Sequence, residues 1–191
     1  MSRYHDDNSY ASDPLHVRLD RARLSRIHPE SWISRLLQHR RTDIEIIDEH
    51  LSFGDSRAAS VVLESPLRVA AYTDELDCAS VLEFTPEETA RIAREFGPVS
   101  VGQRLITVNT YVRGDAPVSD LWNGPRSFHR YANFFPIIAD FYVADARRLQ
   151  DRVAQIGEWE WRRCRDCARE YMSRNARRFR AGSPFASFIP V

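Results

Sequence analysis

The spacing of apolar residues changes several times along the chain, and each change predicts a boundary between elements. A helix is expected to begin at His28-Pro29-Glu30, because Trp32 and the leucines after it share one helical face. Over 43–53 this period is lost, and Gly54-Asp55 is typical of a turn, which favours a strand before it. The segment 13–19 stays open, because its proline suits a helix start while its alternating apolar residues suit a strand.

Two local signals in the middle of the chain are sharper. The apolar runs 67–72 and 78–84 flank a short acidic turn, which predicts a β-hairpin. A capping threonine, Thr85, then precedes a proline and Glu88, whose carboxylate can accept a bond from the threonine amide. This capping box predicts a helix, and Gly97-Pro98 is where that helix is expected to end.

The second half of the chain alternates between regular and irregular patterns. Residues 104–112 are expected to form a strand with two distinct faces. Residues 114–135 have no regular period and carry many aromatic and polar side chains, which is typical of a functional loop. Residues 136–143 are almost continuously apolar apart from Asp140, which predicts a buried strand. Over 146–179 the spacing is helical, with one glycine interrupting it.

These elements together predict an α+β fold with a mainly antiparallel sheet of about five or six strands, flanked by helices and followed by a long C-terminal helical segment. The domain is expected to cover 13–182 as one unit. Residues 1–12 are polar and are expected to form a flexible arm. The tail 183–191 is apolar, so its large side chains are expected to dock on this domain or on a second copy, giving a homo-oligomer. Those side chains are Phe185, Phe188 and Ile189.

Composition excludes several classes of protein. No apolar run reaches the ~18 residues that span a bilayer, and the first residues do not resemble a signal peptide, so we expect a cytoplasmic protein without a membrane span. Basic and acidic residues balance at 27 each, and every basic residue is arginine. Without lysine the chain lacks the lysine of a P-loop, a protein kinase or a Schiff-base enzyme. Its 7 glycines match neither the dinucleotide-binding pattern nor the nucleophile elbow.

The cysteines do not predict a metal or redox site. Cys164 and Cys167 have the C-x-x-C spacing, but the only further thiol is Cys78, so a zinc site would need ligands from three segments, His129 among them. The pair falls inside predicted helix, with Cys164 on its apolar face. Buried cysteines that act as small hydrophobic residues are therefore expected, and no metal or other cofactor is predicted.

One functional hypothesis is an enzyme whose pocket is formed by 119–135. A histidine in this loop would act as general base, a carboxylate would orient it, and nearby arginines would hold an anionic substrate. The residues of this hypothesis are His129, Asp140 or Asp120, Arg126 and Arg130. Because spacing identifies no serine or cysteine nucleophile, the enzyme hypothesis is the alternative to the binding hypothesis described next. The sequence leaves open whether the chain is an enzyme.

The preferred hypothesis is a binding protein. Between 162 and 180 eight arginines stand against two acidic residues. If this segment is one continuous helix, four of the arginines share a face: Arg162, Arg169, Arg177 and Arg180. Such a row neutralises phosphates or an acidic protein surface, so nucleic acid or an acidic protein is the expected partner. The competing interpretation is a solvated face whose charges pair within the protein.

Overall fold

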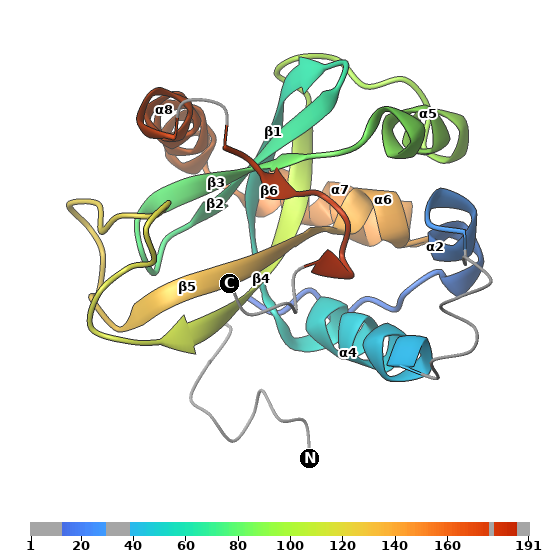
Figure 1. Ribbon diagram of the computed structural model, residues 1–191, viewed down its shortest axis with the longest axis horizontal. Helices are drawn as coiled ribbons and strands as arrows, with labels where there is room; N and C mark the ends of the chain where they lie inside the picture. The colour runs from blue at the N-terminus through green and yellow to red at the C-terminus, as the bar shows by residue number, and fades with distance from the viewer. Residues whose placement is uncertain (1–12, 30–38, 176–177, 187–191) are drawn as a thin grey trace.

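The structure, a computed structural model, describes residues 13–29, 39–175 and 178–186, without the side chains of 39–42. Six strands form one curled sheet in the order β5-β4-β1-β2-β3-β6 (Figure 1). All neighbours pair antiparallel except β3 and β6, which are parallel. The strands are β1 (Asp55–Glu64), β2 (Leu67–Thr73), β3 (Cys78–Glu83), β4 (Arg104–Arg113), β5 (Tyr131–Ile138) and β6 (Arg180–Ala181). The predicted α+β class is therefore confirmed.

Helices lie at both ends of this sheet. Figure 1 shows α8 at one end and α2, α5 and α6 grouped at the other. The helix α8 packs on β1, β2 and β3, whereas α4, α6 and α7 pack on β4. The helices are α2 (Arg21–Ile27), α4 (His39–Phe53), α5 (Pro86–Glu95), α6 (Ala139–Tyr142), α7 (Ala146–Gln155) and α8 (Glu158–Arg174). Within the described ranges, no helix is long and apolar enough to cross a membrane.

The two sharp local predictions are confirmed. Strands β2 and β3 pair as a hairpin from Arg68 opposite Glu83 to Thr73 opposite Cys78. At the start of α5, the Thr85 hydroxyl accepts a hydrogen bond from the Glu88 amide, and the Glu88 carboxylate accepts one from the Thr85 amide. Both signals are local in sequence, so the rest of the fold does not override them.

The expectations for the first 53 residues were partly wrong. Residues 43–53 belong to the helix α4, not to a strand; Ile47 and Leu51, four residues apart, are fully buried on one helical face. The helix α2 has a capping aspartate, Asp20, and ends at Ile27; its C-cap is His28, where a helix was expected to begin. The remainder of that expected helix lies outside the described residues. The segment 13–19 forms no helix and bridges to the sheet at Pro14.

The C-terminal half also differs from expectation in two places. Strand β5 ends at Ile138, and Asp140 lies in the short helix α6 instead of within a strand. The helical pattern predicted over 146–179 divides at Gly157 into α7 and α8, and α8 ends at Arg174. The chain then turns, and Arg180 lies in the edge strand β6. The C-terminal helix is therefore shorter than the apolar spacing predicted.

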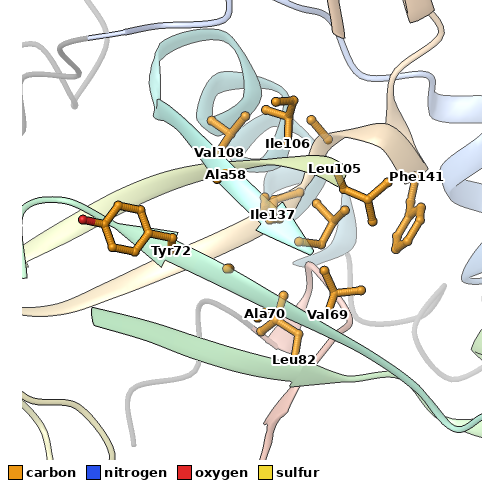
Figure 2. Packing of buried hydrophobic residues seen from close by; sticks show 14 of the residues in the cluster. Ala58, Val69, Ala70, Tyr72, Leu82, Leu105, Ile106, Val108, Ile137 and Phe141 are labelled. Carbon is orange, nitrogen blue, oxygen red and sulfur yellow. The ribbon is translucent and has the colours of Figure 1, made fainter. Parts of the chain in front are cut away.

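In the core, small and branched side chains of the central strands pack with large aromatic side chains, among them Trp161, Phe84 and Phe141. Figure 2 shows Ala58, Val69, Ala70 and Leu105 packed together, with Tyr72 at one end of the cluster and its hydroxyl pointing away from it. The three cysteines are buried and free, as expected for small hydrophobic residues.

The tail begins to dock on its own chain. The Phe185 ring lies 5.8 Å from the His28 ring in an edge-to-face arrangement. Just before it, a Cβ added at Gly182 would stand 2.6 Å from the Phe84 ring, so the chain runs directly over the core. Phe188 and Ile189 lie outside the described residues, and docking on a second copy remains a prediction.

Candidate anion-binding surface

Asp77 joins three parts of the molecule beneath the candidate surface. It ends the β2–β3 turn with a φ of 51° and is fully buried. Its Oδ1 accepts bonds from the Tyr72 hydroxyl at 2.9 Å and from Nε of Arg163 in α8 at 2.8 Å. Its Oδ2 accepts bonds from Nη2 of Arg163 at 3.0 Å and from the Arg126 amide at 3.1 Å. The turn, the loop before β5 and α8 are therefore fixed to one carboxylate.

These bonds also set the charge of Asp77. Burial acts to raise the pKa of this carboxyl, but the hydrogen bonds from Arg163, the Arg126 amide and Tyr72 outweigh it. The pKa consequently lies below its ordinary value of 3.8. Asp77 is therefore a stable anion at neutral pH, which suits a structural anchor and not an acid or base.

A glycine makes the close approach of the loop to the turn feasible. A Cβ at Gly124 would stand 2.1 Å from the carbonyl oxygen of Asp77, too close for any side chain. The Gly124 amide donates to the Leu76 carbonyl at 2.8 Å, and the Phe128 amide donates to the Glu75 carbonyl at 3.1 Å. The 124–128 part of the loop is thus held against the hairpin by backbone bonds.

The anchored loop presents two arginine–aromatic pairs to solvent. The guanidinium of Arg126 lies 5.2 Å from the centre of the Trp159 ring, which belongs to the first turn of α8. The guanidinium of Arg130 lies 4.9 Å from the centre of the Phe128 ring. Trp159 is 46% exposed and Phe128 is 55% exposed, so both rings keep surface open to a partner.

The solvent side of α8 continues this surface with arginines. Its inner side buries Trp161, Cys164 and Tyr171. Arg162, Arg165 and Arg169 are exposed and follow one another at helical spacing, so they share the outer face. We call these three residues, together with Arg126, Arg130, Phe128 and Trp159, the basic–aromatic surface.

Two acidic side chains of α8 lie beside the basic–aromatic surface and are already paired. Glu158 accepts a bond from Arg104 at 2.7 Å, and Asp166 accepts one from Arg169. The Arg104 bond, with the nearby charges of Arg165 and Arg162, lowers the pKa of the Glu158 carboxyl. Among the residues that the structure describes, Arg162 and Arg165 form no ion pair of their own, so their charges face solvent.

The predicted row of four arginines is not on one helix face. Arg162 and Arg169 lie on α8 as expected, and Arg177 lies outside the described residues. Arg180 is elsewhere: its Nε donates to Oδ2 of Asp120 at 2.7 Å, and its Nη2 donates to Oδ1 at 2.9 Å. The reason is the end of α8 at Arg174, after which the helical spacing no longer applies. The exposed arginines of α8 therefore lie nearer the start of this helix than the sequence predicted.

Sequence reasoning missed three members of the surface. Phe128 lies in the loop that was predicted to be functional, but its spacing does not mark it as an exposed ring. Arg165 lies three residues after Arg162, a spacing that was readable without knowing where the helix ends. Trp159 was missed because nothing local shows that a loop arginine stacks on it.

The residues of the enzyme hypothesis are not brought together. His129 is exposed just before β5 with a φ of 54°, whereas Asp140 is buried just after β5. The strand between them has 8 residues, which corresponds to about 26 Å. Asp120, the alternative orienting carboxylate, is held by Arg180 and by the Tyr171 hydroxyl at 2.9 Å. Neither carboxylate is placed to orient His129.

A second charged cluster lies where β1 begins. Arg57 is almost fully buried and contacts three carboxylates: Asp55 at 3.0 Å, Asp13 at 2.6 Å and Asp74 at 2.7 Å. Burial raises the pKa of the Asp55 carboxyl to about 7; Arg57 opposes this rise and the Asp74 charge adds to it. The cluster joins the segment before α2 to β1 and to the hairpin turn.

The described residues contain no group of three or more histidine, cysteine, aspartate or glutamate side chains placed to hold a metal ion. Comparison with models of protein families, with curated proteins and with solved structures gives no match to this chain.

Proposed function

We propose that the protein is a binding protein that holds single-stranded nucleic acid on the basic–aromatic surface. The observation that carries this proposal is the presence of two exposed rings, Trp159 and Phe128, each beside an arginine, next to the arginines of α8. Arginines neutralise phosphates, and aromatic faces stack with bases regardless of sequence.

The aromatic rings favour nucleic acid over an acidic protein. An acidic protein surface needs only the charges of Arg162, Arg165 and Arg169. Two large rings that are about half exposed would gain little from carboxylates, whereas each provides a face on which an unpaired base can stack. Unpaired bases are accessible in a single strand and are stacked inside a duplex.

Anchoring by Asp77 further supports the proposal. The loop that carries Arg126 and Phe128 is bonded to the hairpin turn, and the turn is bonded to α8 through Arg163. A preformed surface loses little conformational entropy on binding, so more of the contact energy remains as affinity.

The test is fluorescence anisotropy with a labelled single-stranded oligonucleotide at low salt. We expect binding that falls by orders of magnitude between about 50 and 200 mM salt. The double variant Arg162→Glu/Arg165→Glu should bind at least tenfold more weakly than the unmodified protein. The matched control is Arg21→Glu/Arg147→Glu, which changes the net charge equally at exposed first-turn positions of α2 and α7, where acidic residues are tolerated.

An equal loss of oligonucleotide affinity in both double variants would show a nonspecific charge effect and contradict the proposal. The absence of oligonucleotide binding at low salt would also contradict it. Binding of poly-glutamate, but not of the oligonucleotide, with the loss confined to the Arg162/Arg165 variant, would assign the surface to an acidic protein instead. Replacing Phe128 with alanine should weaken oligonucleotide binding without changing its salt dependence, because stacking releases no counterions.

A further inference from the structure

A pocket of about 670 Å³ opens between α7 and the start of β4, and it shares no residue with the basic–aromatic surface. Leu149 and Val153 of α7 and Ile156, its C-cap, form one apolar side, and Phe96 faces the pocket from the end of α5. The volume falls in the range of small-molecule sites, and the lining combines this apolar side with polar and charged side chains of the neighbouring elements.

Asp140 is the buried charged group of this pocket. It is only 9% exposed, and its Oδ2 accepts a hydrogen bond from the Ile106 amide at 2.7 Å. Burial raises the pKa of this carboxyl to about 6, and the Ile106 bond offsets that rise only in part. Within the part of the chain that the structure describes, no arginine or histidine forms an ion pair with it. At neutral pH the pocket therefore holds a carboxylate without a cationic partner, which is a costly arrangement in apolar surroundings.

The other charges around the pocket already have partners. They come from four neighbouring elements: Arg23 of α2, Glu95 of α5, Arg104 of β4 and Glu158 of α8. Arg104 is paired with Glu158 at 2.7 Å, and Glu95 is paired with Arg26 at 2.6 Å. Arg23 donates through Nη1 to a backbone carbonyl at 2.7 Å and its Nε lies 3.8 Å from its own capping aspartate, so its charge has an acidic neighbour although this buried Nε has no hydrogen-bond partner among the described residues. The uncompensated charge of the pocket is consequently negative and belongs to Asp140.

We propose that this pocket binds a small organic cation, a primary ammonium with an apolar body. The ammonium would pair with the Asp140 carboxylate, and the body would lie along Leu149, Val153 and Ile156. Such a ligand supplies the missing positive charge and removes apolar surface from water in the same step. A neutral analogue would supply only the second effect, and an anionic analogue would be repelled. This inference does not depend on the nucleic-acid proposal.

The test compares three probes of equal chain length: hexylammonium, hexanol and hexanoate. Binding is followed by calorimetry and by the NMR shift of the Ile106 amide, which reports on Asp140. Hexylammonium should bind at least tenfold more tightly than either analogue. Asp140→Asn keeps an acceptor for the Ile106 amide and should reduce hexylammonium affinity at least tenfold. The control Asp151→Asn makes the same chemical change on the exposed side of α7 and should leave the affinity unchanged.

Two further measurements keep the proposal testable if Asp140→Asn is poorly folded. Hexylammonium affinity of the unmodified protein should rise about tenfold between pH 5 and pH 7, as the Asp140 carboxyl ionises. Val153→Arg keeps Asp140 but adds a competing cation to a partly buried wall, and it should abolish binding. Equal affinity for hexanol and hexylammonium overturns the proposal. A pH-independent affinity, full binding by a folded Asp140→Asn variant or no binding of hexylammonium also overturns it.

Discussion

Arg163 contacts Asp77 at three points: Nε donates to Oδ1 at 2.8 Å, and Nη2 donates to Oδ2 and to the backbone oxygen, both at 3.0 Å. The aspartate belongs to the hairpin turn and the arginine to α8, 86 residues later. This bidentate geometry suits a guanidinium and a carboxylate better than any other pair of side chains.

Replacing Arg163 with alanine should destabilise the protein by about 3 kcal/mol, because the buried Asp77 carboxylate loses its only charged partner among the described residues. Chemical unfolding at neutral pH measures this loss. The neighbouring substitution Arg162→Ala removes an exposed arginine and should change stability by less than about 0.5 kcal/mol. A similar effect of the two substitutions would mean that the Asp77 contact contributes little.

Replacing Thr85 with alanine should cost about 1 kcal/mol, because the Glu88 amide loses the side-chain acceptor that caps α5. Thermal unfolding gives the measurement, and Thr85→Ser, which keeps the hydroxyl, is the control. An unchanged melting temperature for Thr85→Ala would show that the capping bond is replaced by water at no cost.

Features that depend on a few adjacent residues could be predicted from the sequence, whereas features that depend on contacts between distant segments could not. The capping box of α5 and the β2–β3 hairpin depend on a few adjacent residues, and both were predicted. Residues 43–53 fit two periods at once: Ile44, Ile47 and Leu51 have helical spacing, whereas Ile46 and Phe53 add an alternating pattern that favours a strand. In the structure the helical period holds, because Ile47 and Leu51 share one buried face of α4.

The candidate sites depend on contacts that no local pattern encodes. The end of α8 at Arg174 has no glycine or proline signal, so the row of arginines was extended too far. The sequence does mark Asp140, because it is the one charged residue in the apolar run 136–143. Its surroundings come from α5, α7 and β4, which are brought together only by folding. The partner assigned to it, His129, lies at the other end of β5.

Gly124→Ala should loosen the basic–aromatic surface. The added Cβ would stand 2.1 Å from the Asp77 carbonyl oxygen, so the loop must move away from the hairpin turn. We expect a loss of stability of about 1–3 kcal/mol and weaker oligonucleotide binding, because Arg126 and Phe128 would no longer be held in place. Ser119→Ala, an exposed change in the same loop, serves as the control. Unchanged affinity in a destabilised Gly124→Ala variant would show that binding does not need the anchored loop.

The last prediction concerns the effect of pH on stability through Asp140. Its folded pKa of about 6 lies above the ordinary value of 3.8, because burial disfavours the charged form. Between these two values the folded state holds a proton that the unfolded state has released, so this residue makes the protein less stable as pH rises from about 4 to 6. The rise in pKa corresponds to roughly 3 kcal/mol.

Asp140→Asn removes this titration, so its free energy of unfolding, relative to that of the unmodified protein, should increase by about 2–2.5 kcal/mol between pH 4 and pH 7. Urea unfolding at several pH values gives the two curves. Asp55, whose pKa is also raised, and Asp77, whose pKa is lowered, titrate in both proteins and cancel in the difference. Parallel curves would mean that the Asp140 carboxyl is solvated or paired. The pocket between α7 and β4 would then lack the uncompensated negative charge that the proposed ammonium ligand requires.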